Sequence, residues 1–201
     1  MPVSILYKNL RKRVLTLKKQ FLNFQPAESV LPENQDQLRA FKLLVHAEIE
    51  SYIEKSVLEV LNKCINEWKT KKRVTVPLPF LIMFSSSKFE ANEKQLTKEN
   101  RINQILESFK SVVSSNNGIK EKNILKLIVP LGINYSSIDD TRLTTIDSYG
   151  HSRGEVAHNS LSAKKQLDKN SELNDLHLVL TGIKKIDIRL QKISSCKKKP
   201  F

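Results

Sequence analysis

The sequence predicts an all-α fold, a helical bundle of about five to six helices in a single domain over residues 1–195. Apolar residues recur every three or four positions through most of the chain, which is the spacing of one helix face. Only residues 73–84 depart from this pattern, and no internal repeat is visible. The 201 residues, 39% of them hydrophobic and 27% charged, can bury one sizeable core, and they exclude collagen-like and mostly disordered chains.

The first helix is predicted over residues 4–24, inside a basic N-terminal segment, residues 1–24, that contains no acidic residue. Gln25 and Pro26 end it, because proline cannot continue the hydrogen-bond ladder, and a loop is expected over residues 25–37. Its apolar face consists of Leu6, Leu10, Val14, Leu17, Phe21 and Phe24.

A second, long helix is predicted over residues 36–69. At ~1.5 Å per residue it would span on the order of 50 Å and form the backbone of the bundle. Residues 73–84 then break the pattern with Pro77 and Pro79, which favour a short extended or hairpin connection, with an edge strand as one form of it. We therefore expect an irregular insertion over residues 73–97.

Four further segments complete the predicted bundle. Thr97 is the expected N-cap of the next helix, whose apolar face runs from Ile102 to Val113 and which ends at the polar residues 114–118. The remaining helical segments are residues 121–129, 138–158 and 171–193, and a basic tail follows over residues 196–201.

The net charge of +13 is concentrated in three clusters. The N-terminal helix carries six cations, residues 69–73 carry four and the tail carries three, which together equal the whole surplus. A surplus of this kind favours nucleic acid or an acidic membrane as partner, whereas solvated helix faces are the alternative explanation. The candidate nucleic-acid-binding residues are Lys8, Arg11, Lys12, Arg13, Lys18, Lys19, Lys69, Lys71, Lys72 and Arg73.

Cysteine usage and hydropathy predict a cytoplasmic protein that does not enter a membrane. Cys64 and Cys196 are too few for a disulfide framework or a zinc site, so a reducing compartment is expected. The N-terminus lacks the apolar region of a secretory signal, and the longest apolar run, residues 80–84, is far too short to span a bilayer. No common phosphate-binding or catalytic motif occurs among the five glycines, so no cofactor is expected.

Four histidines are candidates for chemistry. His177 lies beside the apolar stripe of the last helix and is expected to be structural. His46 and Glu50 share a helix face at i, i+4 and could hold a metal or form a buried hydrogen-bonded pair; no third ligand is evident, and we expect no metal. His151 and His158 lie close together, in the sequence HSRGEVAHN.

Arg153, four intervening residues and then His158 resemble the R-x(4–6)-H motif of the HEPN superfamily, most of whose members are metal-independent ribonucleases. The motif follows an apolar-periodic stretch and precedes one final amphipathic helix. Residues 41–53 also resemble the first long helix of the RiboL-PSP-HEPN branch, and the likeness covers about residues 35–195. The resemblance implies a HEPN-like bundle, RNA as substrate, a homodimer with a composite active site, a toxin or antiphage defence role, and a cognate antitoxin or regulatory protein as partner.

Three positions depart from the family pattern. Gly154 replaces the usual polar residue after the arginine, and Asn159 replaces the glycine that commonly follows the histidine. Ser160 stands where some family toxins carry a tyrosine that is modified by a partner enzyme, so an antitoxin acting through that tyrosine is not expected. We treat Glu50, His46, Asn159 and Gly154 as supporting residues of the candidate site.

The two residues of the motif suit RNA cleavage by the neighbouring 2′-hydroxyl. With a reference pKa of ~6.5, His158 can act as base or acid near neutral pH. Arg153 stays charged and offers a planar fork of donors to the phosphate oxygens. The products would carry 2′,3′-cyclic phosphate and 5′-hydroxyl ends.

Helix geometry sets a condition on this pair. Five residues at ~100° each place Arg153 and His158 about 140° apart around a regular helix. Either the helix ends between them, or the long arginine side chain reaches round to a common cleft. In a homodimer, two copies of His158 could divide the base and acid roles, and Glu50 could orient the arginine or the histidine or form a plain structural ion pair.

Two other function classes remain open from the sequence. The chain could be a non-catalytic HEPN-type nucleic-acid or nucleotide-binding module. The departures from the family pattern at Gly154 and Asn159 favour this class. It could also be an interaction protein whose apolar helix faces bind a partner, such as the other protein of a toxin–antitoxin pair.

Overall fold

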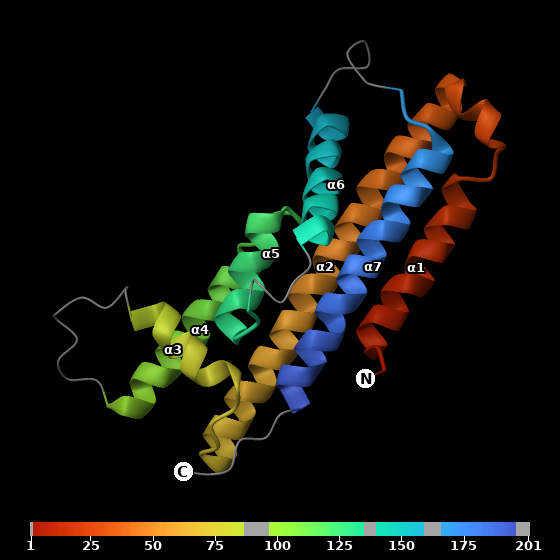
Figure 1. Cartoon of the computed structure of the whole chain (residues 1–201). Coiled ribbons are helices and arrows are strands. Elements are labelled where there is room, and N and C mark those ends of the chain that lie inside the picture. The colour runs from red at the N-terminus through yellow and green to blue at the C-terminus, as the bar shows by residue number, and fades with distance from the viewer. Residues whose placement is uncertain (1, 87–96, 135–139, 159–165, 196–201) are drawn as a thin grey trace.

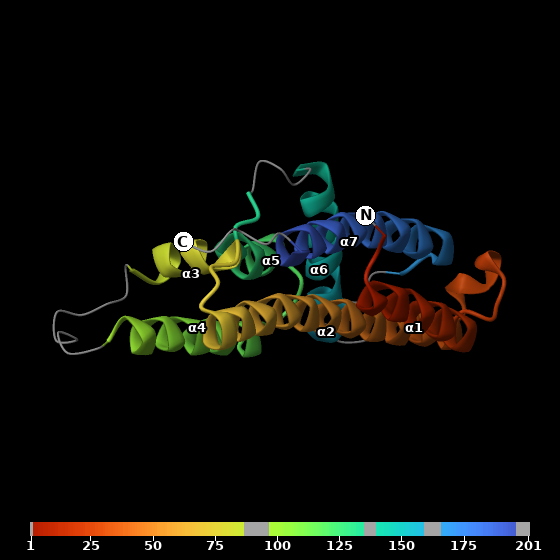
Figure 2. The ribbon, with the colours of Figure 1, turned by 90° about the horizontal axis from the view of Figure 1, so that it is seen from below.

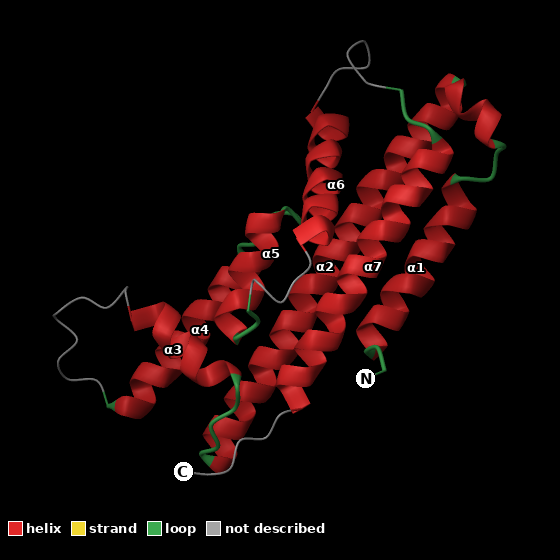
Figure 3. Cartoon of the chain, viewed as in Figure 1, coloured by secondary structure: helices red, strands yellow, loops and turns green. Residues whose placement is uncertain are grey.

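The computed structural model describes residues 2–86, 97–134, 140–158 and 166–195 of the 201-residue chain. Within these ranges it contains seven α-helices and two short 3₁₀ helices, and no strand (Figure 3). The all-α bundle predicted from the sequence is confirmed. The elements are α1 (Ile5–Phe21), η1 (Pro26–Val30), α2 (Pro32–Lys71), α3 (Pro77–Ser86), α4 (Lys98–Ser114), α5 (Glu121–Ile128), η2 (Val129–Leu131), α6 (Asp140–His158) and α7 (Lys169–Ser195).

Helix α2 is the central element of the fold (Figure 1). It has 40 residues and therefore spans ~60 Å. It begins four residues earlier than expected, because Pro32 is tolerated in the first turn of a helix, where its missing N–H needs no partner. It ends at Lys72, whose φ of 50° is left-handed and whose N–H bonds to the carbonyl of Trp68. Helices α1, α4, α6 and α7 all pack against it.

Helix α1 folds back along α2 as an antiparallel hairpin, and Figure 2 shows both beside α7. Ser4 caps α1 by accepting the N–H of Tyr7, and it also donates its own N–H and hydroxyl to Asp187 of α7. The hydroxyl of Tyr52 in α2 donates to the same carboxylate at 2.7 Å. Three helices therefore meet at one buried aspartate.

The extended or hairpin connection expected over residues 73–84 is wrong. Residues 77–86 form helix α3, because Pro77 and Pro79 both fall in its first turn, where backbone N–H groups have no partner within the helix. The irregular insertion expected over residues 73–97 is thus helical in its middle, and residues 87–96 lie outside the described part. Helix α3 raises the number of α-helices to seven in the described chain.

The turn at Gly132, directly after η2, explains how α3 packs. Gly132 has a φ of 90°, and a Cβ there would lie 2.6 Å from the ring of Phe80. Only glycine allows both the left-handed backbone and this close approach. The ring of Phe80 in α3 therefore covers the end of η2, and Leu78 and Leu81 of the same helix are buried in the core.

The other predicted boundaries differ by a few residues. Thr97 caps α4 as expected, since its side chain accepts the N–H of Asn100. The predicted loop 25–37 contains the short helix η1. Within the described ranges, no helix is both long enough and apolar enough to cross a membrane.

Candidate functional site

A polar stripe runs along the otherwise apolar inner face of α2. Lys42, His46 and Glu50 follow one another at four-residue spacing, and the first two are almost fully buried. Burying a polar side chain costs free energy unless it has a hydrogen-bond or charge partner, so such side chains are found where they have a partner or a function. The contacts of these three residues with α6, α7 and the segment before α5 therefore define the candidate site.

Lys42 is paired. Its Nζ atom lies 2.7 Å from the carboxylate of Glu172 in α7 and 5.3 Å from the ring centre of Tyr149 in α6. Burial, followed by the nearby negative charge of Glu172, raises the pKa of Tyr149. Removal of one member would leave a buried charge without its partner, so this group ties α2, α6 and α7 together.

His46 and Glu50 lie against the segment that precedes α5. The Nδ1 atom of His46 is 3.9 Å from Glu50, too far for a hydrogen bond, and Glu50 accepts the N–H of Gly118. Gly118 has a φ of 98° and is close to the His46 ring. Asn116 donates to Glu54 one turn further along α2. Carboxylates of α2 therefore fix this segment over the imidazole.

The imidazole of His46 is neutral at physiological pH. Burial, and then the positive charge of Arg153, lowers its pKa from 6.5 to about 4. The Nδ1 atom is buried and has no hydrogen-bond partner within the described part of the chain. The site thus contains a neutral ring with unused hydrogen-bonding capacity.

Arg153 on α6 supplies the permanent positive charge of the site. It is partly buried, and its Nε atom is buried without a hydrogen-bond partner in the described residues. No described carboxylate forms an ion pair with it. A guanidinium in this condition can bind an external anion such as a phosphate. Glu50, which we considered as a group to orient Arg153 or a histidine, lies next to His46.

Helix α6 continues through His158 without a break. A helix end between Arg153 and His158 is therefore excluded, and the two Cα atoms lie about 140° apart around the axis. At Gly154 a Cβ would meet no described atom within 4 Å. The side chain of His158 and all of Asn159 lie outside what the structure describes.

The basic residues of α1 do not reach this site. Figure 1 shows α1 and α6 on opposite sides of the α2–α7 pair. Arg13 pairs at 2.9 Å with Glu48, which is two residues from both His46 and Glu50 and therefore faces a different side of α2. All six cations of α1 are exposed: Lys8, Arg11, Lys12, Arg13, Lys18 and Lys19.

The second basic cluster, residues 69–73, lies at the C-terminal end of α2 and is largely paired. Lys71 and Arg73 both contact Glu67, and Lys72 contacts Glu99 of α4 at 2.6 Å. These cations therefore form a surface separate from that of α1. The tail cluster lies outside the described residues.

Sequence reasoning missed Lys42 and Gly118. The signal for Lys42 was its place in the four-residue stripe with His46 and Glu50, between buried apolar neighbours. Gly118 was interpreted as a helix terminator only, because its contact with His46 joins segments far apart in the chain. Among the described side chains, no group of three or more His, Cys, Asp or Glu is placed to hold a metal ion.

The fold and the site define a class: a helical bundle in which an arginine of a late helix meets a buried polar stripe on the long central helix. The model of one protein family, RiboL-PSP-HEPN, matches residues 8–192. No curated protein and no solved structure matches the chain. Because the family match extends from α1 into α7, the chain belongs to the RiboL-PSP-HEPN family, and the family resemblance seen in the sequence is confirmed.

Proposed function

We propose that this protein is a metal-independent endoribonuclease that uses Arg153 and His158, with a toxin or antiphage defence role. The observation that carries the proposal is the partly buried guanidinium of Arg153 beside a neutral imidazole, with an Nε atom that has no hydrogen-bond partner in the described part of the chain. Family membership supports a nucleotide- or RNA-related HEPN module, and the ribonuclease activity extends it.

In the proposed reaction, a phosphoryl group of the RNA backbone is transferred from the 5′-oxygen to the neighbouring 2′-oxygen. One imidazole removes the proton of the 2′-hydroxyl, the 2′-oxygen bonds to phosphorus, and the bond from phosphorus to the 5′-oxygen breaks as that oxygen gains a proton. Arg153 stabilises the charge on the non-bridging oxygens. The neutral state of His46 matters here, because a protonated imidazole next to Arg153 would repel the guanidinium.

A homodimer would supply the second proton-transfer group. The single His158 of one chain cannot be base and acid at the same moment, whereas two copies across a two-fold interface can divide the roles. HEPN domains often dimerise, which supports this arrangement.

The test is incubation of end-labelled RNA with the protein in excess EDTA, followed by analysis of the product ends. Wild type is expected to produce 2′,3′-cyclic phosphate and 5′-hydroxyl ends. His158→Ala should lose at least 100-fold in rate, since one acid–base group contributes ~10²–10⁴-fold. Arg153→Ala should lose at least 100-fold as well, since one donor to the transition-state charge contributes ~10²–10³-fold. Arg153→Lys keeps the charge but loses the planar fork, so an intermediate rate is expected. His177→Ala, an exposed histidine of α7, is the control.

A His158→Ala variant that cleaves at the wild-type rate would contradict the proposal. Absence of cleavage by every protein, with a salt-sensitive gel shift by all of them, would favour the non-catalytic RNA-binding module instead.

A further inference from the structure

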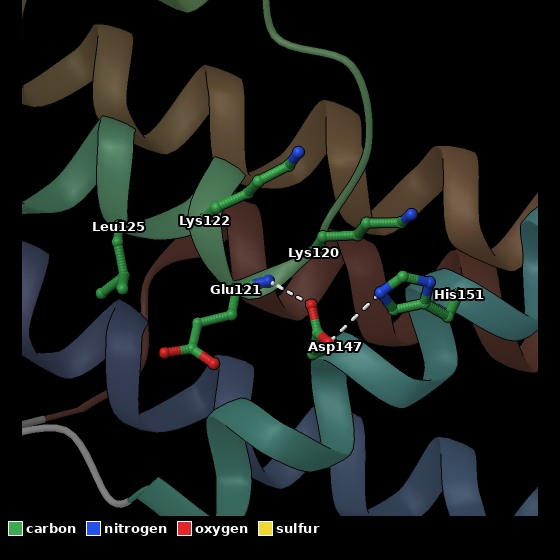
Figure 4. Close-up of a pocket in the computed structure, with 6 residues that line it drawn as sticks. All are labelled: Lys120, Glu121, Lys122, Leu125, Asp147 and His151. Carbon is green, nitrogen blue, oxygen red and sulfur yellow. Dashed lines mark hydrogen bonds and ion pairs between the residues drawn. The ribbon is translucent and has the colours of Figure 1, made fainter.

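A pocket of about 340 Å³ lies between the first turn of α5 and the middle of α6. It is lined by Lys120, Glu121, Lys122, Leu125, Asp147 and His151 (Figure 4). None of these residues belongs to the pair Arg153 and His158, and the basic surfaces of α1 and of residues 69–73 lie elsewhere.

The carboxylate of Asp147 is already occupied. One oxygen accepts the N–H of Glu121 at 2.9 Å, and the other lies 3.5 Å from the Nε2 atom of His151. Asp147 therefore fixes the start of α5 against α6 and holds the imidazole at the pocket wall. The backbone N–H of Glu121 is consequently not available to a ligand.

The two lysines are available. Neither the Nζ of Lys120 nor that of Lys122 has a hydrogen bond or ion pair with any residue in the described ranges. Figure 4 shows both amino groups on the side of the α5 turn opposite to the carboxylate of Glu121. The lining of the pocket therefore includes two ammonium groups that are unpaired within the described ranges and an exposed imidazole, a set of donors that suits the oxygens of a phosphate.

Helix geometry connects this pocket to the candidate site. His151 and position 158 are seven residues apart, which places them within ~20° on one face of α6 and ~10.5 Å apart along its axis. Gly154 lies between them on the same side, and no described atom occupies the space above it. A strand of RNA can therefore lie along this face without meeting a side chain at position 154.

We propose that the pocket formed by Lys120, Lys122 and His151 is a subsite for a phosphate of the RNA strand next to the one that is cleaved. The inference rests on the proposed RNA substrate and adds a place where the strand is held. The two lysines together neutralise the charge of that phosphate, and the released counterion makes binding salt-dependent.

The test is the salt dependence of binding to a fluorescent single-stranded RNA in which every 2′-hydroxyl is methylated, so that cleavage by 2′-oxygen attack is impossible. For single strands each phosphate contact contributes ~0.7 to the slope of log K against log salt. The variant Lys120→Ala with Lys122→Ala removes this one contact and is expected to lower the magnitude of that slope by about 0.7. The matched control is Lys63→Ala with Lys192→Ala, two exposed lysines of α2 and α7, which removes equal charge and is expected to leave the slope unchanged.

An unchanged slope in the pocket variant, or an equal fall in the control, overturns the subsite. A mononucleotide offers the same phosphate chemistry without a strand. If the pocket variant binds adenosine monophosphate more weakly than wild type while its RNA slope is unchanged, the pocket is a nucleotide site and the proposal is wrong.

The result separates the two proposals, because binding to methylated RNA needs no activity. If the slope falls as expected but wild type cannot cleave RNA, the ribonuclease proposal is wrong, and the pocket is supported as a phosphate contact of a bound strand. A wild type that cleaves RNA, together with an unchanged slope, removes the subsite alone.

Discussion

His46 is a buried histidine that folding keeps neutral. Its folded-state pKa of about 4 lies well below the unfolded value of 6.5, so the unfolded chain binds more protons between these two values. Stability is therefore full above pH 6.5 and is lost progressively as the pH falls toward 4.

We expect His46→Gln to remove this part of the acid sensitivity. The free energy of unfolding of wild type should fall between pH 7 and pH 4 by on the order of 3 kcal/mol more than that of the variant. Urea unfolding at a series of pH values measures the difference, and it does not depend on the stability of the variant at neutral pH. His177→Gln on the exposed face of α7 should behave as wild type; equal acid sensitivity in all three proteins would contradict the assignment.

Gly154 and Gly132 are expected to respond in opposite ways to the same substitution. At Gly154 a methyl group meets no described atom and the backbone is helical, so Gly154→Ala should stabilise the protein by about 0.5–1 kcal/mol. Gly132→Ala should destabilise it, because its φ is 90° and the new Cβ would lie 2.6 Å from Phe80. Thermal unfolding of both variants measures this, and a loss of stability at position 154 would show that another group covers it.

At this scale the sequence identified the types of residue better than their contacts. The motif selected Arg153 and His158 as candidates, and helical spacing selected His46 with Glu50. The pairing of Glu50 with the N–H of Gly118 could not be foreseen, because it depends on how residues 116–118 fold back onto α2. A residue pattern fixes neighbours along one helix, whereas contacts between distant segments depend on the packing of the whole bundle.

At the scale of elements, Asp187 joins α1, α2 and α7. Its carboxylate is 1% exposed and receives hydrogen bonds from Ser4, Tyr52 and Gln191. Burial, and then the bond to Asp187, raises the pKa of Tyr52. The hydroxyl thus remains a donor over the whole range in which the protein is handled.

We expect Tyr52→Phe to destabilise the protein by about 1.5–3 kcal/mol, since it removes a donor from a buried charge. Tyr7→Phe is the matched control: its hydroxyl donates to the neutral carbonyl of Leu180 at 2.9 Å, and the loss should be near 1 kcal/mol. The two rings contact each other edge to face, so both variants keep the same packing. Urea unfolding compares them, and equal losses would mean that the charge of Asp187 contributes nothing to this joint.

Helical periodicity predicted α1, α2, α4, α5, α6 and α7 to within a few residues, because each buries one apolar face. It failed at α3, where the apolar run of residues 80–84 has no polar face to show a period. The two prolines were taken as breakers of secondary structure, although the first turn of a helix tolerates them. Their positions relative to the start of α3 decided the outcome, and no local pattern reveals that start.

At the scale of the whole molecule, the positive charge and the candidate site are separated. The six cations of α1 lie on one side of the α2–α7 pair, while Arg153 and the pocket of Lys120 and Lys122 lie toward α6 (Figure 1). The α1 surface can raise the local concentration of RNA through its field. In the proposed reaction, the contacts near the cleaved phosphate would come from α5 and α6.

The separation bears on the proposed homodimer, because a two-fold axis near α6 would bring two copies of Arg153 and His158 to one groove and leave both α1 surfaces outside. We expect a particle of twice the 23.1 kDa chain mass in sedimentation analysis.

Differently tagged wild-type and His158→Ala chains, co-expressed and purified as the mixed dimer, test whether the two histidines divide one reaction. If they do, the mixed dimer should be nearly as inactive as the His158→Ala homodimer, because either the base or the acid is missing at the single groove. Half of the wild-type activity, or an active monomer, would show that each chain carries a complete site.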